Sequence, residues 1–194
     1  MSPNMRLSSK QGKNTGDFGL WLTNYFKDTL SYQKFQVYYD HGDSTKEANV
    51  VATKGFIGEN VTNLNRLTDI DVMIVSPNGS VSLLIEIEER YASPKKILGD
   101  VLAGLICNRF AIRLNGKQHD FSVTASTKLI VAGIVPTSGI RLEKVERTML
   151  PRIQQLSGLS DGLNPRNVEF IFSENIQTTI EKLQNIIKNF YPQC

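Results

Sequence analysis

Four acidic residues lie at matching positions in the segment LTDIDVMIVSPNGSVSLLIEIEER, residues 67–90. Asp69 and Asp71 precede the apolar run VMIV. Glu86 and Glu88 lie at the end of the run LLIEIE. Residues two apart on a strand point to the same face of a sheet, and carboxylates that share a site raise each other's pKa unless a cation intervenes. This spacing therefore indicates a site for a hard divalent cation, Mg²⁺ or Mn²⁺, because both prefer oxygen ligands.

The turn between the two acidic pairs is predicted at the Asn-Gly dipeptide 78–79. Asn-Gly is the strongest short hairpin signal, because both central residues of a type I′ turn need a positive φ. Such a turn places Asp71 opposite Glu86. It also places Asp69 opposite Glu88, so that all four carboxylates share one face. Taken singly, each acid is more typical of a solvated sheet rim, but two acidic pairs brought into register favour a metal or catalytic site.

The acidic strands belong to a predicted α/β domain with a mixed central sheet flanked by helices. Helices that alternate with strands favour a sheet covered on both faces. The apolar periodicity predicts, in order, a helix over 15–30 capped by Thr15, a strand over 35–40, the hairpin, a helix that begins at Ser93, a strand over 128–136, a helix over 141–156, a strand over 168–172 and a helix over 174–190.

Length and composition predict a single domain. The chain has 194 residues, of which 40% are hydrophobic and 21% are charged, as is usual for one globular unit. Residues 1–14 are predicted to form a frayed terminus, and residues 40–66 a long polar loop. No uninterrupted apolar run approaches the roughly 20 residues that span a bilayer. Because the polar start is followed by no apolar segment of the kind found in secretory signals, we expect a cytoplasmic protein.

The two acidic strands resemble the motif of the PD-(D/E)xK nuclease superfamily, which includes restriction endonucleases, Holliday-junction resolvases and DNA repair nucleases. That motif has an acid at the start of one hairpin strand, an acid on the next strand and a lysine two residues beyond. The family's core is ordered helix, three strands, helix, strand. DIDVMIV and LLIEIEER match the two motif strands. The resemblance implies a restriction-endonuclease-like fold in which Asp71 and Glu86 hold Mg²⁺ or Mn²⁺, with Asp69 as the alternative first acid.

The chain departs from the family pattern at the lysine. Glu88 stands at that position, as it does in one branch of restriction endonucleases, and no proline precedes Asp71. Lys95 and Lys96, in the first turn of the next predicted helix, offer another source of the ammonium group. Lys96 lies off the apolar stripe of that helix and is able to reach back toward the acids, but it is equally typical of a solvated helix lysine.

The implied activity is Mg²⁺-dependent hydrolysis of phosphodiester bonds in double-stranded DNA, with a type II-like restriction endonuclease as the leading subtype. Asp71 and Glu86 would position the metal. Glu88 would orient or deprotonate the attacking water or hold a second ion, and Lys96 would stabilise the transition-state oxygens. Cutting two strands favours a homodimer. The alternatives are a non-catalytic module that binds nucleic acid or protein, and a junction resolvase.

Contacts to DNA are predicted in two polar segments. The long loop contributes Lys54 and Arg66, and the segment around a predicted turn at Asn115–Gly116 contributes Arg113 and Lys117. The formal net charge of +3 is compatible with a polyanionic partner without requiring one. The two histidines and two cysteines have no zinc-site spacing, so zinc is not indicated.

Overall fold

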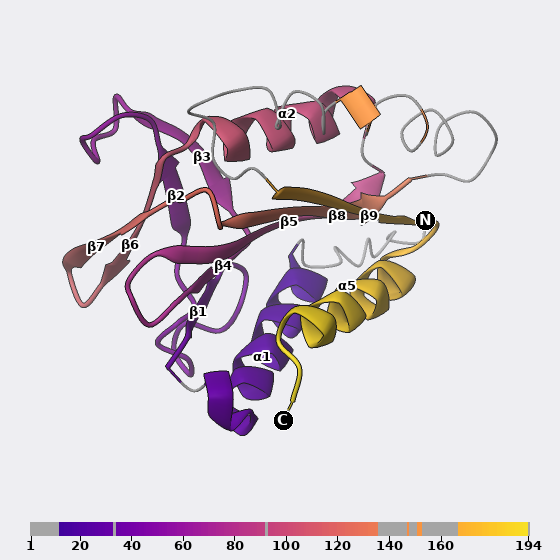
Figure 1. The fold of residues 1–194 in the computed structure, drawn as a ribbon, viewed down its shortest axis with the longest axis horizontal. Helices are drawn as coiled ribbons and strands as arrows, with labels where there is room; N and C mark the ends of the chain where they lie inside the picture. The colour runs from indigo at the N-terminus through magenta and orange to yellow at the C-terminus, as the bar shows by residue number, and fades with distance from the viewer. Residues whose placement is uncertain are drawn as a thin grey trace, which may run out of the picture.

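The computed structural model describes residues 12–32, 34–91, 93–135, 147, 151–152 and 167–193. Within these residues the protein is an α/β structure with two sheets and three α-helices (Figure 1). None of the described helices is both long and apolar enough to cross a membrane. The helix predicted over 141–156 falls almost entirely outside the described residues. So does most of the predicted terminus 1–14, although Lys13 and Asn14 belong to a helix.

The larger sheet is mixed, as the sequence predicts. Its spatial order is β1 (Gln36–Tyr39), β4 (Val72–Val75), β5 (Val81–Tyr91), β8 (Lys128–Ile134) and β9 (Asn167–Ser173). Strands β1, β4 and β5 are antiparallel, whereas β5, β8 and β9 are parallel. Helix α2 (Pro94–Ile106) covers one face, and helices α1 (Lys13–Asp28) and α5 (Ile176–Phe190) cover the other (Figure 1). A short 3₁₀-helix, Leu30–Tyr32, follows α1.

Strand β5 separates two hydrophobic layers. Ile85 and Ile87 are buried in the layer that contains residues of α1 and α5. Leu84 is buried in the layer that contains residues of α2. Because successive side chains of a strand point to opposite faces, Glu86 and Glu88 follow Leu84 onto the α2 side. The apolar residues of β5 therefore determine which face the two acids occupy.

A second sheet, which the sequence did not predict, packs beside the first. Its spatial order is β3 (Arg66–Ile70), β2 (Thr53–Phe56), β6 (Arg109–Leu114) and β7 (Lys117–Ser122). Strand β2 lies inside the predicted loop 40–66. The first strand of the predicted hairpin is also divided, because the chain leaves the second sheet after Ile70 and enters the first at Val72. Asp69 therefore pairs with Lys54 of β2, and its predicted place opposite Glu88 is wrong.

The two Asn-Gly dipeptides form different turns. Asn115 and Gly116 both have positive φ, 49° and 76°, as a type I′ turn requires. In the predicted type I′ turn at 78–79, only Gly79 has a positive φ, 81°, so the predicted turn type is wrong. Its N–H donates to the Ser76 carbonyl at 2.9 Å, which closes a turn with Pro77 at its second position. A register shift next to this turn then restores the predicted pairing of the β4 residues Val72–Ile74.

Helix α1 begins earlier than predicted, and its N-terminus is capped by a side chain of strand β5. The residue before its first turn is Gly12, which has no side chain to cap the helix, so the predicted Thr15 cap is wrong. Instead the Glu89 carboxylate accepts hydrogen bonds from Thr15 N at 2.7 Å, Thr15 Oγ1 at 2.9 Å and Asn14 Nδ2 at 3.3 Å. A carboxylate at a helix N-terminus also interacts favourably with the helix dipole.

The replacement Glu89→Ala should lower the free energy of unfolding by about 1–2 kcal/mol, because it removes both the cap and the favourable charge. Urea unfolding followed by circular dichroism measures this change. Glu59→Ala, in an exposed loop, is the matched control and should change stability by less than about 0.5 kcal/mol. Equal stabilities of the two variants would show that Glu89 does not cap α1.

Candidate functional site

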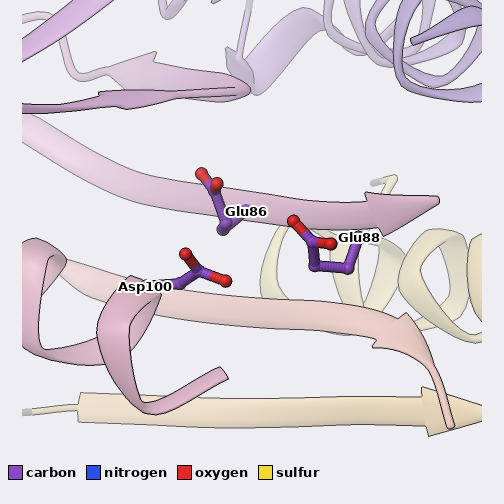
Figure 2. A group of neighbouring side chains, drawn as sticks. All are labelled: Glu86, Glu88 and Asp100. Atoms are coloured by element: carbon purple, nitrogen blue, oxygen red, sulfur yellow. The ribbon is translucent and has the colours of Figure 1, made fainter. Parts of the chain in front are cut away.

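Three carboxylates from two elements converge on the α2 side of β5. Glu86 and Glu88 project from β5, and Asp100 projects from α2 (Figure 2). One carboxylate oxygen from each of the three lies within 4.8 Å of the others. The three side chains are all partly buried. Three hard oxygen donors at this separation are able to hold a divalent cation such as Mg²⁺ or Mn²⁺.

Helix α2 is anchored so that Asp100 points at the sheet. Ser93 caps the helix by accepting a hydrogen bond from Lys96 N at 3.2 Å, as the sequence predicts. Ile97 and Val101 are fully buried in the layer under α2. Asp100 lies three residues after Ile97, so it occupies a position within the buried stripe of the helix. Sequence reasoning missed this residue, although an acid inside an apolar stripe is a usable signal.

A glycine on the neighbouring strand leaves room for the cluster. Gly133 of β8 pairs with Glu88 in the sheet. A Cβ atom at Gly133 would lie 3.0 Å from Glu88 Cβ, which is tighter than most real contacts. The absence of a side chain at Gly133 therefore allows Glu88 its position beside Asp100.

Asp71 lies at the point where the chain passes from one sheet to the other. Its Oδ2 accepts a hydrogen bond from Ile87 N at 2.7 Å, and its carbonyl accepts one from Asp40 N at 2.9 Å. These bonds hold Asp71 beside Glu86, as the predicted register requires. Asp71 is outside the three-carboxylate cluster but lines the same cleft of about 450 Å³, together with Glu86, Glu88 and Lys96.

Burial and like charge disfavour ionisation of these acids. Loss of hydration raises the pKa of Asp71 to about 6. The same cause raises the pKa of Asp100 to about 6, and the charge of Glu88 adds to the rise. The pKa of Glu86 is raised well above its ordinary value, first by burial and then by the neighbouring carboxylates. Without a cation, ionisation of this cluster at neutral pH therefore lowers the stability of the folded protein.

Two oxygens of the cluster lack the partners that buried polar atoms usually have. Among the described residues, neither Glu86 Oε2 nor Asp100 Oδ2 has a hydrogen-bond partner, although both atoms are buried. A bound cation would satisfy both. The donor set and these two unsatisfied oxygens fit a hard divalent metal.

Lys96 contributes a positive charge to the site. Its ammonium group forms an ion pair with Glu88. Burial opposes its charge, but the hydrogen bond to Glu88 and the nearby acids together raise the pKa of Lys96, so the ammonium remains protonated. Lys95, one residue earlier, is exposed. The structure thus places Lys96 next to the acids from the helix that the sequence indicates.

The four predicted DNA-contacting residues all lie in the second sheet. Lys54 of β2 and Arg113 of β6 line a surface cleft of about 440 Å³ together with polar residues of the loop before β3. Arg66 is engaged in an ion pair with Asp69 of the same strand. Lys117 shares a sheet face with its partner Leu114, not with Arg113, because adjacent residues of a strand alternate.

Comparisons with protein-family models, curated proteins and solved structures found no match for this chain. The chemistry of the site therefore rests on its own geometry. A cleft that combines carboxylate oxygens with an ammonium group is suited to binding a divalent metal and polarising a phosphate ester.

We expect Asp71→Asn to stabilise the metal-free protein at pH 7. Asp71 titrates near pH 6 when folded, against an ordinary value of 3.8, so the folded state binds more protons between these pH values. The contribution of protonated Asp71 to the free energy of unfolding is therefore fully present below about pH 4 and is lost as the pH rises through about 6. Removing the charge should restore on the order of 2 kcal/mol at pH 7.

Urea unfolding between pH 4 and pH 8 in EDTA provides the measurement, with the exposed-loop variant Glu59→Gln as the control. The two variants should have equal stability at about pH 4 and diverge above it. Saturating Mg²⁺ should stabilise the wild type more than Asp71→Asn. Parallel pH profiles for Asp71→Asn and wild type would contradict the assigned burial cost.

Proposed function

We propose that the protein is a metal-dependent endonuclease that hydrolyses phosphodiester bonds in double-stranded DNA, with a restriction-endonuclease-like core and two copies acting together. The observation that carries this proposal is the cleft shared by Asp71, Glu86, Glu88 and Lys96. The cleft combines carboxylate ligands for a metal with the ammonium group of Lys96 on α2. Phosphodiester hydrolysis needs this combination.

The order of elements supports the fold assignment. The family's core is helix, three strands, helix, strand. In this chain α1, β1, β4, β5, α2 and β8 follow one another in that order, with β1, β4 and β5 antiparallel and β8 parallel to β5. The pairs β2–β3 and β6–β7 are insertions into this core.

Each residue of the cleft has a role in the proposed reaction. A metal held here would lower the pKa of a bound water and offset the negative charge that develops on the phosphate oxygens. Glu86, together with Asp71 and Asp100, would hold the metal. Glu88, which forms an ion pair with Lys96, would orient or deprotonate the attacking water or hold a second ion. Lys96 would donate hydrogen bonds to the phosphate oxygens.

Glu86→Gln should weaken divalent-metal binding and abolish DNA cleavage, because it removes the negative charge of Glu86 while keeping the size of the side chain. Isothermal titration with Mn²⁺ and a plasmid-cleavage assay in Mg²⁺ measure the two effects. Cleavage that persists at the wild-type rate in this variant would remove Glu86 from the site. Metal binding in the wild type without cleavage of plasmid or of branched DNA junctions would favour a non-catalytic binding module.

Lys96→Ala should lower the cleavage rate by about 100-fold or more, because it removes positive charge from the transition state. Lys95→Ala is the matched control, since Lys95 is exposed in the same helical turn, and it should keep the wild-type rate. Single-turnover cleavage of a labelled duplex at saturating enzyme separates this chemical effect from binding. Equal rates for the two variants would leave Lys96 with only its structural ion pair.

The double variant Lys54→Ala/Arg113→Ala should weaken duplex DNA binding. It should also make the plot of log affinity against log salt concentration less steep, by an amount that corresponds to about two fewer phosphate contacts. Fluorescence anisotropy in Ca²⁺, across a range of salt concentrations, provides the measurement. Lys188→Ala is the control, because Lys188 is exposed on α5, across the main sheet from the cleft. An unchanged salt slope in the double variant would place the DNA elsewhere.

A further inference from the structure

His41 lies at the edge of the cleft that contains the acids. It follows β1 by two residues, and its side chain is 41% exposed. Its Nε2 atom lies 3.9 Å from Asp71 Oδ1, and both residues line the same cleft as Glu86. Sequence reasoning set both histidines aside because neither has a metal-site neighbour along the chain. The partner of His41 is 30 positions away and becomes visible only in the fold.

The separation of the two atoms fits shared coordination better than direct bonding. A distance of 3.9 Å is too long for a hydrogen bond. Two ligands that each lie about 2.1 Å from one ion are separated by roughly 3 to 4.2 Å, depending on the angle at the metal. The gap between Nε2 and Oδ1 therefore has the width that one divalent ion requires.

The backbone holds the imidazole in this position. His41 has a φ of 65°, a left-handed conformation that among non-glycine residues is found mostly for asparagine, aspartate and histidine. Its ring packs against Gly12, where a Cβ atom would lie only 2.2 Å from the ring. The neighbouring N–H of Asp40 is bonded to the Asp71 carbonyl. The histidine is thus fixed beside Asp71 by the start of α1 and by the loop itself.

We propose that His41 Nε2 and Asp71 Oδ1 bind one divalent cation, next to the position formed by Glu86, Glu88 and Asp100. This proposal rests on the proposed function only in taking Asp71 as a metal-binding acid. Water and substrate phosphate complete the coordination, as is usual for Mg²⁺ and Mn²⁺ sites with few protein ligands. Because imidazole suits transition metals better than Mg²⁺, His41 makes this position favour Mn²⁺ over Mg²⁺.

The decisive test is direct detection of the nitrogen ligand on bound Mn²⁺. Electron spin-echo spectroscopy of the Mn²⁺-loaded full chain should reveal coupling to an imidazole nitrogen. His41→Asn should abolish this coupling, and asparagine is chosen because it tolerates the left-handed backbone. His119→Asn, at an exposed position on β7, is the matched control and should retain it. Absence of nitrogen coupling in the wild type, or its survival in His41→Asn, would overturn the proposal and leave a simple ion pair with Asp71.

Metal affinity gives a second and independent readout. His41→Asn should weaken Mn²⁺ binding by about tenfold and Mg²⁺ binding by less than about threefold, since only Mn²⁺ gains from the nitrogen ligand. Equal losses for both metals would indicate a structural role and contradict the proposal. Circular dichroism melting of both histidine variants verifies that they are folded. Nitrogen coupling in a protein that cuts no DNA would support the His41 ligand while removing the proposed nuclease function, so the two failures are distinguishable.

Discussion

The crowding of carboxylates on the α2 side of β5 is the constraint on which the rest of the site depends. Glu86 and Glu88 are brought there by the alternation of the strand, and Asp100 is brought there by the buried stripe of α2. Burial raises the pKa of Glu86, and two buried oxygens of the cluster have no hydrogen-bond partner in the part of the chain that the structure describes. Such a cluster destabilises the metal-free fold, which is the usual cost of a preorganised functional site. A cation bound between these carboxylates would offset their mutual repulsion.

One chain segment passes from the second sheet to the first and connects the proposed metal site with the proposed DNA surface. Strand β3 lies in the second sheet, β4 lies in the first, and Asp71 is the residue between them. The second sheet carries Lys54 and Arg113, whereas the first carries the acids of β5. Asp71 alone separates the two sheets along this part of the chain. A duplex bound to the second sheet would therefore have a defined position relative to the cleft. The C-terminal end of β5 also holds the N-terminus of α1 next to the cleft, because Glu89 caps α1 while its neighbour Glu88 lines the cleft.

Several elements were predictable because their signals are local. The Ser93-Pro94 start of α2, the doubly buried strand β8 and the mixed character of the main sheet follow from capping, continuous apolar runs and helix–strand alternation. The Asn-Gly turn at 78–79 predicted the right pairing through the wrong turn type, because the residue inserted by a longer turn is compensated by a register shift. The second sheet was missed because its short strands β2 and β3 are paired across a polar loop that carries no strong periodicity.

The sequence by itself determined the acidic strand β5, the register that sets Asp71 beside Glu86, and the helix that brings Lys96 to the acids. Each depends on spacing within a strand, a turn or a helix cap, which are short-range properties of the chain. Only the tertiary structure decided that Asp69 belongs to another sheet, that Asp100 completes the cluster and that His41 faces Asp71. These three outcomes depend on which strands compete for pairing and on how α2 and α1 pack, and such long-range contacts leave no periodic trace in the sequence.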